Sequence, residues 1–135
     1  MPEVFPAASV VVSVPARPDV VHILRSVAAS VAARSALTVD SIEDLKIAVD
    51  EASAQLLSAA PRASTLTMTL AADGMVVDVQ LSADEETPIW PPDGIERSLG
   101  WQVLKGLSDE VRYERTSQGA AVTFRKRGVV GASLS

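Results

Sequence analysis

Asp73-Gly74 constrains the fold of this chain more than any other feature of its sequence. The pair lies between Thr65–Ala71 and Met75–Leu81, two segments in which apolar and polar residues alternate. An Asp-Gly pair at such a junction is the strongest hairpin signal in the sequence. The middle of the chain is therefore predicted to form two antiparallel strands.

Two further segments extend this predicted sheet. Glu110–Thr116 and Ala120–Arg125 flank a turn at residues 117–119 and predict a second hairpin. Ser9–Val14 is a valine-rich run that stops at Pro15, which predicts a strand near the start of the chain. Both faces of that first strand are largely apolar, so we expect one of them to contact a partner.

Three segments have the apolar spacing of amphipathic helices. The first opens at Pro18-Asp19, and the second begins at a capping box made by Asp40 and Glu43 and ends before Pro61. The third is predicted over Glu96–Ser108. The positions predicted to face the core are Val20, Leu24, Val27 and Val31 in the first helix, Ile42, Leu45, Val49, Ala52 and Leu56 in the second, and Leu99, Val103, Leu104 and Leu107 in the third.

The resulting order is β-α-α-β-β-α-β-β, in which strands are grouped into hairpins and do not alternate with helices. This order predicts an α+β two-layer sandwich, with three helices on one face of a mostly antiparallel, mixed sheet. A length of 135 residues suits one domain. We expect residues 1–135 to form that single domain, with a core over about 9–127 and a flexible tail at 128–135.

Composition excludes several classes of function. The chain has no cysteine and one histidine, which excludes disulfide scaffolds, thiol catalysis and His-rich metal centres. A net charge of −5 gives no electrostatic basis for binding nucleic acid, so proteins and small molecules are the expected partners. The start of the chain lacks the basic residues of a signal peptide, and its apolar run is too short for a membrane span. We therefore expect a cytoplasmic protein without membrane contact.

The second predicted helix carries the main candidate for chemistry, Glu51 and Gln55. Residues four apart share a helix face, and this pair lies at the margin of the buried stripe. A carboxylate and an amide presented together suit a metal ion and a water near a phosphate. The same spacing is common on solvated helix surfaces, so spacing alone leaves both interpretations open.

Four other features have both a structural and a functional interpretation. His22 has no serine or acid partner nearby in the sequence that would suggest a catalytic triad. Gly100-Trp101 opens an apolar helix and suits either a phosphate-facing turn or a core position for the indole. The basic run at residues 125–127 is typical of a solvated strand end. The acidic, proline-rich loop Ser82–Gly94 offers Trp90 as an exposed aromatic anchor for a partner.

Four strings, taken with the order of elements, resemble a known bacterial family. They are VPARPDVVHILRSV, DLKIAVDEASAQLL, RSLGWQVLKGLSDEV and GAAVTFRK, and together they span about residues 10–127. The chain resembles the anti-sigma-factor serine kinases, which have a histidine-kinase-like (GHKL, or Bergerat) ATPase fold. Members of that family bind an alternative sigma factor of RNA polymerase. They also use ATP and magnesium to phosphorylate a serine of an anti-anti-sigma factor.

The resemblance assigns roles to individual residues. Glu51 matches the glutamate that serves as the catalytic general base, and Gln55 stands where the family has its magnesium-binding asparagine. Gly100 matches the second glycine of the pair at the edge of the ATP lid, and Ser98 replaces the first. For the aspartate that binds adenine, Asp84 is a displaced candidate, and Ser82 lies closer to the matching position.

The resemblance also implies partner contacts. Arg25 matches an arginine of the first helix that contacts partner proteins. The family forms homodimers through the region of the first strand. We therefore expect an alternative sigma factor, an anti-anti-sigma factor and a second copy of the chain as partners.

Several departures from the family pattern bear on which function to expect. Gln55 is one methylene longer than asparagine, the glycine-rich adenine loop is replaced by an acidic stretch at residues 84–86, and Ala121 lacks a threonine hydroxyl. Each of these departures weakens a nucleotide site. We therefore expect an anti-sigma factor that sequesters its sigma factor and is released by an anti-anti-sigma factor. The alternative is an active ATP-dependent serine kinase.

Overall fold

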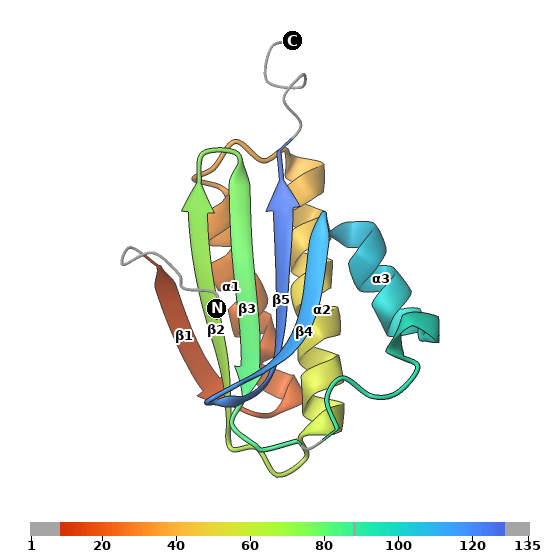
Figure 1. The fold of residues 1–135 in the computed structure, drawn as a ribbon. Helices are drawn as coiled ribbons and strands as arrows, with labels where there is room; N and C mark the ends of the chain where they lie inside the picture. The colour runs from red at the N-terminus through yellow and green to blue at the C-terminus, as the bar shows by residue number, and fades with distance from the viewer. Residues whose placement is uncertain (1–8, 88, 129–135) are drawn as a thin grey trace.

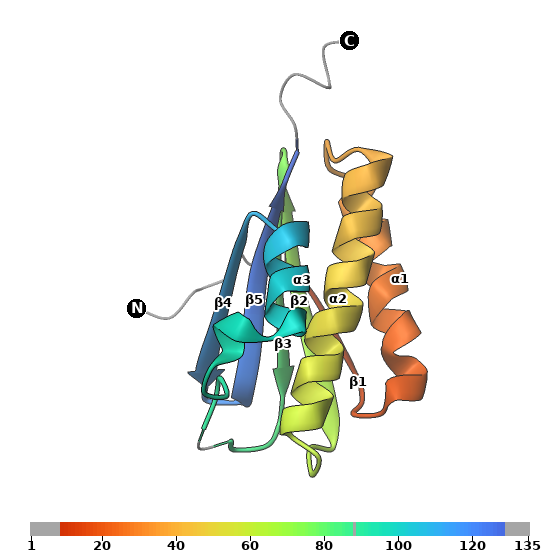
Figure 2. The ribbon, with the colours of Figure 1, turned by 90° about the vertical axis from the view of Figure 1, so that its right-hand side faces the viewer.

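One five-stranded sheet and a layer of helices make up the fold, and the computed structural model describes residues 9–87 and 89–128 of it. The strand order is β1-β2-β3-β5-β4, and each of the four neighbouring pairs is antiparallel. The strands are β1 (Val10–Pro15), β2 (Thr65–Asp73), β3 (Val76–Ala83), β4 (Glu110–Thr116) and β5 (Gly119–Arg127). All helices lie on one face of this sheet (Figure 1, Figure 2). The predicted α+β two-layer fold is confirmed, and residues 129–135 of the predicted tail lie outside the described chain.

Glycine makes both hairpin turns possible. Gly74 has a φ of 62° in the turn between β2 and β3, where Asp73 pairs with Val76. Gly119 opens β5 with a φ of 125°, and a Cβ there would lie 2.1 Å from the carbonyl oxygen of Ala83. Any side chain at residue 119 would therefore collide with backbone at the end of β3.

The helices are α1 (Val21–Ala32), α2 (Val39–Ala59) and α3 (Leu99–Leu107), with 3-10 turns at Pro18–Val20 and Ile95–Arg97. The predicted capping box is wrong, because α2 begins one residue before Asp40. Its N-cap is Thr38, whose hydroxyl oxygen accepts a hydrogen bond of 3.1 Å from the backbone N–H of Ser41. Asp40 instead lies in the first turn, where its negative charge favours the positive end of the helix.

The third helix is shorter than predicted. Residues 95–97 form a separate 3-10 turn, and Ser98 caps α3 by accepting a hydrogen bond from the N–H of Trp101. Because α3 begins at Leu99, that side chain lies in the first turn and is 79% exposed, not inward as predicted. Leu104 is the fully buried residue of this helix.

The core lies between the sheet and α1 and α2. Its fully buried members from the helices are Leu24, Ala28, Ala32, Leu45, Ala48, Val49, Ala52 and Leu56, and the strands add Leu66, Met68, Leu70, Val77, Val79, Leu81, Val122 and Phe124. The small alanine residues let α1 and α2 approach closely, and the alternation of β2 and β3 directs every second side chain inward. Ile42 is partly buried against this core.

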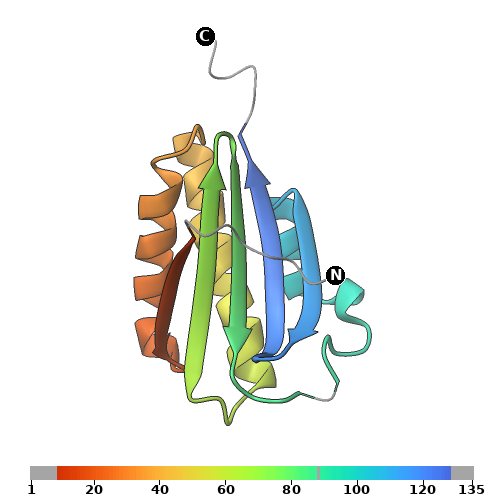
Figure 3. The ribbon, with the colours of Figure 1, turned by 60° about the vertical axis from the view of Figure 1, so that its left-hand side comes forward.

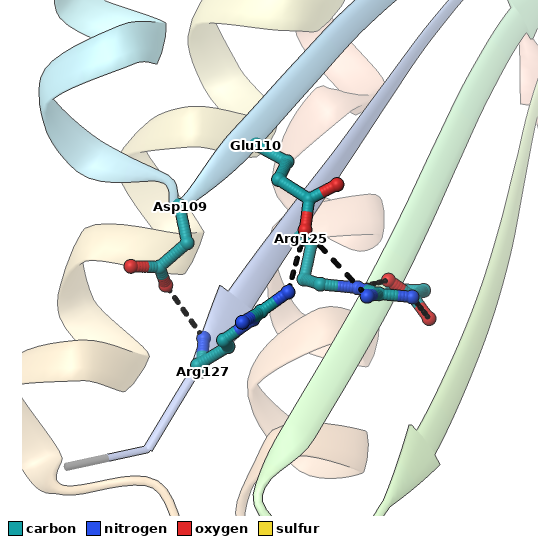
Figure 4. A network of polar contacts seen from close by, with 5 residues as sticks. Asp109, Glu110, Arg125 and Arg127 are labelled. Carbon is teal, nitrogen blue, oxygen red and sulfur yellow. Dashed lines mark hydrogen bonds and ion pairs between the residues drawn. The ribbon is translucent and has the colours of Figure 1, made fainter.

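None of the described helices covers the opposite face of the sheet (Figure 3), and that face carries polar side chains. Arg125 pairs with Asp78 at 2.7 Å, Glu110 accepts a hydrogen bond of 2.6 Å from Arg127, and the backbone N–H of Arg127 donates to Asp109 (Figure 4). With Lys126 bonded to Asp44, each residue of the basic run faces a carboxylate. The run is therefore neutralised within the fold and offers little charge to a nucleic acid.

The first strand is an edge strand with apolar residues on both faces, as its sequence indicates. Val14 is buried and Val12 packs against the core, whereas Val11 is 62% exposed on the face that the described helices leave uncovered.

Among the described helices, none is both long enough and apolar enough to cross a membrane.

Candidate functional site

Glu51 and Gln55 contact each other on the flank of α2 that faces α3. The side-chain amide of Gln55 donates a hydrogen bond of 3.1 Å from Nε2 to Oε2 of Glu51. The two side chains meet because one turn of helix separates them. Both are half-buried because α3 packs across them. The two residues that the sequence singled out are therefore one hydrogen-bonded pair.

Gly100 lets the start of α3 lie directly on this pair. A Cβ at Gly100 would be 2.5 Å from Oε2 of Glu51 and 2.6 Å from Nε2 of Gln55. Both distances are too short for van der Waals contact, so a side chain at residue 100 would displace the ends of the Glu51 and Gln55 side chains. Ser98, two residues earlier, holds the first turn of α3 through its hydroxyl. The structure thus brings together four of the predicted site residues.

A hollow of about 540 Å³ opens between α2, the start of α3 and the loop before it. Its volume is in the range of small-molecule sites. The residues that line it are Glu51, Ala54, Gln55, Ser58, Ala59, Trp90, Pro92, Ile95, Ser98 and Gly100. We call it the α2–α3 pocket. Glu51 is the single charged side chain in this lining.

Tyr113 of β4 joins the site from the sheet, and the sequence analysis missed it. Its hydroxyl donates a hydrogen bond of 2.8 Å to Oε1 of Gln55. Burial raises the pKa of Tyr113 to about 12. The hydrogen bond to Gln55 lowers this pKa, and the negative charge of Glu51 raises it further. The phenol is therefore protonated at neutral pH. The alternation of β4, in which Val111 and Tyr113 point toward the helices, was the available signal.

Trp90 is buried, which corrects the prediction of an exposed anchor. Its side chain is 7% exposed, and Nε1 donates a hydrogen bond of 3.0 Å to the carbonyl oxygen of Ala121. Its ring meets that of Tyr113 edge-on, with centroids 5.6 Å apart, and Trp101 lies 5.9 Å from the same ring. The loop therefore contributes its indole to the wall of the pocket, whereas Ile89 beside it is exposed.

Asp84 follows directly after β3, its carboxylate is hydrogen-bonded within the protein, and it does not line the α2–α3 pocket. Its carboxylate accepts hydrogen bonds from the backbone N–H groups of Ser64 and Thr65 and from the Ser64 hydroxyl, at 2.8 to 2.9 Å. The Thr65 N–H and the Ser64 hydroxyl are the main reasons why the pKa of Asp84 is lowered. Glu85 likewise accepts from the N–H of Arg62. These acids fasten the connection between α2 and β2 to the end of β3.

Arg25 lies on the other side of α2, in a second hollow. Its Nη1 donates to both carboxylate oxygens of Asp50, at 2.8 and 3.0 Å. A hollow of about 600 Å³, which we call the α1–α2 groove, is lined by Pro18, Val21, His22, Arg25, Asp50, Ala54, Leu57 and Ser58. His22 contacts the carbonyl oxygen of Asp19 through Nδ1. Arg25 is therefore separated from Glu51 by the body of α2.

A match to a known family identifies the class of protein to which this fold belongs. A family model described as the histidine kinase-like ATPase domain matches residues 14–126, and the chain belongs to that family. Within it, the chain is similar to the serine-protein kinase RsbW of Bacillus subtilis (strain 168), at 30% identity over 131 residues that cover 84% of this chain and 81% of that relative.

Two further comparisons agree. The serine-protein kinase RsbW of Bacillus licheniformis is 29% identical over 131 residues, covering 83% of this chain and 81% of the relative. Among solved structures, the histidine kinase domain of a blue-light activated histidine kinase from Erythrobacter litoralis superposes with a TM-score of 0.52 at 18% identity. This chain spans 61% of that structure, which is similar in fold.

The α2–α3 pocket does not fit a nucleoside triphosphate with its magnesium ion. Its single charged lining residue is a carboxylate, which repels phosphate. The amide oxygen of Gln55, the atom with the chemistry of a magnesium ligand, faces β4, where it accepts a hydrogen bond from the Tyr113 hydroxyl. Within residues 9–87 and 89–128, no three His, Asp or Glu side chains gather as metal ligands.

We predict that Gly100→Ala is less stable than Gly106→Ala by about 1 kcal/mol, because the added methyl displaces the side-chain ends of Glu51 and Gln55 and breaks the hydrogen bond between them. The matched control is Gly106→Ala in the same helix, where a Cβ meets nothing within 4 Å. That control is expected to be neutral or stabilising by up to about 1 kcal/mol. Urea unfolding measures both variants, and equal effects would contradict the close packing at Gly100.

We predict that Asp84→Asn lowers stability at pH 7, because an uncharged amide oxygen accepts from the N–H groups of Ser64 and Thr65 more weakly than a carboxylate, and the amide nitrogen cannot accept from the Ser64 hydroxyl. A pKa lowered by folding stabilises the protein above the ordinary value of 3.8, and the stabilisation is lost as the pH falls through the folded value. The difference from the wild type should therefore shrink below about pH 3.8. Urea midpoints from pH 7 to pH 3 test this, with Asp93→Asn, an exposed acid of the next loop, as the control.

Proposed function

We propose that this chain is an anti-sigma factor that binds and sequesters an alternative RNA polymerase sigma factor, and that an anti-anti-sigma factor releases it. The proposal is supported by membership of the histidine kinase-like ATPase family and by similarity to the RsbW kinases. The observation that carries it is the chemistry of the α2–α3 pocket, whose single charged lining residue is Glu51. A pocket of that kind suits a protein that regulates by binding.

The α1–α2 groove is the proposed contact surface for the sigma factor. Its walls are apolar at Val21 and Leu57, and its polar centre is the Arg25–Asp50 pair. Both charged side chains are more than a third exposed, so the pair contributes at most about 1 kcal/mol to folding. Arg25 can therefore exchange Asp50 for an acidic residue of a partner at little cost in stability.

A homodimer formed through β1 is part of the same proposal. β1 lies at the edge of the sheet, so one side of its backbone is available for pairing. Val10 and Val11 are exposed on this strand, at 39% and 62%. A second copy placed there would cover apolar side chains and satisfy backbone groups together.

The second candidate function is a protein serine kinase that acts on the anti-anti-sigma factor with ATP and magnesium. It is favoured by the convergence of Glu51, Gln55, Ser98 and Gly100 on one pocket. In that function Glu51 would be the general base, and Gln55 would have to turn its amide oxygen away from Tyr113 to hold the metal ion. Ser98 and Gly100 would lie against the nucleotide.

We predict that Arg25→Glu weakens binding to the cognate sigma factor by at least tenfold, because a carboxylate there repels Asp50 and an acidic partner group alike. Binding is measured by surface plasmon resonance with the purified sigma factor. Lys46→Glu makes the same change of charge on α2, outside the groove, and should bind as the wild type does. Glu51→Ala should also leave binding unchanged. Equal binding by Arg25→Glu and Lys46→Glu would contradict the proposed surface.

We predict that ATP binds more weakly than about 100 μM, with or without magnesium. The missing adenine aspartate removes a hydrogen bond of about 1 kcal/mol, the carboxylate of Glu51 repels phosphate, and each 1.4 kcal/mol is a factor of ten in affinity. Isothermal titration calorimetry measures both conditions. Micromolar binding of ATP with magnesium, together with Glu51-dependent phosphorylation of an anti-anti-sigma serine, would establish the kinase in place of the binding regulator.

A further inference from the structure

Tyr113 is placed to act on Gln55 without lining the α2–α3 pocket. Its ring packs against the rings of Trp90 and Trp101, with centroid distances of 5.6 and 5.9 Å. A ring packed against two others can point its hydroxyl in few directions, and here the hydroxyl meets Oε1 of Gln55 at 2.8 Å. Tyr113 therefore contacts the site through one side-chain amide.

The direction of the hydrogen bonds follows from the chemistry of the three groups. An ionised Glu51 can only accept, so Gln55 must present its NH₂ group to Oε2 of Glu51, at 3.1 Å. The amide oxygen then faces β4, where it can only accept, so the Tyr113 hydroxyl must donate. Each group in the chain from Tyr113 to Glu51 fixes the orientation of the next.

We infer that Tyr113 is a positioning residue that holds the Gln55 amide with its oxygen toward β4 and its nitrogen toward Glu51, so that Gln55 offers no oxygen ligand to a cation in the α2–α3 pocket. The inference goes beyond the proposed function, because it concerns the resting orientation of one side chain. It stands whether or not the α1–α2 groove binds a sigma factor.

Tyr113→Phe isolates this role. The phenylalanine ring keeps the contacts with Trp90 and Trp101 and removes only the hydroxyl. The oxygen of Gln55 then loses its donor, and the amide can turn that oxygen toward Glu51 when a cation lies between them. The variant should therefore release the amide and improve cation binding, while a role in packing alone would change neither.

Nuclear magnetic resonance can observe this amide directly, because the chain has four glutamines and no asparagine. Its side-chain amide spectrum should contain only the pairs of Gln55, Gln80, Gln102 and Gln118, and the Gln55→Leu spectrum assigns the first. In the wild type we expect the two Gln55 protons to be widely separated and slow to exchange. In Tyr113→Phe they should move toward the positions of the exposed Gln102 and exchange at least fivefold faster.

A titration with Mn²⁺ alone, which broadens signals near its binding site, tests the consequence. One hydrogen bond of about 1 kcal/mol corresponds to about a fivefold change in affinity. The Gln55 signals should therefore broaden in Tyr113→Phe at about fivefold lower Mn²⁺ than in the wild type, with Gln80 and Gln102 as internal references. Equal Mn²⁺ midpoints, or Gln55 signals unchanged by the substitution, would overturn the inference.

The inference can also be tested from the other end of the contact, in case Tyr113→Phe folds poorly. Tyr113 is the single tyrosine, so ring-labelled tyrosine gives one set of signals. Gln55→Leu should shift those signals, and Gln80→Leu, on the opposite face of the sheet, should not. A tyrosine ring signal whose chemical shift is unchanged in Gln55→Leu would likewise overturn the inference. Weak ATP binding by the wild type affects none of these readouts.

Discussion

The burial of α2 is the constraint on which the rest of this structure depends. Leu45, Val49, Ala52 and Leu56 are fully buried or nearly so, and they fix the helix against the middle of the sheet. Every feature with possible function is then placed relative to that helix. Its flank toward α1 presents Asp50, and its flank toward α3 presents Glu51, because consecutive residues lie about 100° apart around a helix. Local sequence can change on either flank as long as the buried stripe holds the axis in place.

Local sequence predicted the elements that local physics determines. The Asp73-Gly74 hairpin, the inward stripe of α2 and the order of strands and helices followed from turn chemistry and periodicity. Helix starts were less accurate, because Thr38 and Asp40 are both good capping residues and only the path of the preceding chain selects between them. The strings shared with a known family placed Glu51, Gln55, Ser98 and Gly100 on one site before their distances were known.

Long-range contacts account for what the sequence did not predict. The polar loop around Trp90 predicts an exposed side chain, but its indole N–H donates a hydrogen bond to the carbonyl oxygen of Ala121, 31 residues away. Asp84 looked available for a ligand, but Ser64 and Thr65 present three donors to it across the end of the sheet. Tyr113 reaches Gln55 over 58 residues. Contacts of this kind depend on how strands and loops pack together, so a pattern read along the chain contains no direct signal for them.

The two hollows beside α2 share Ala54 and Ser58, so the wall between them is one helix thick and carries only small side chains at that point. A rigid helix cannot shift or rotate toward one hollow without changing the shape of the other. Occupants of the two sides would therefore be thermodynamically linked through the position of α2. This linkage is reciprocal. If a protein bound at Arg25 changed the affinity of the opposite pocket for its ligand by some factor, that ligand would change the affinity for the protein by the same factor. An allosteric regulator of this architecture would need no moving domain.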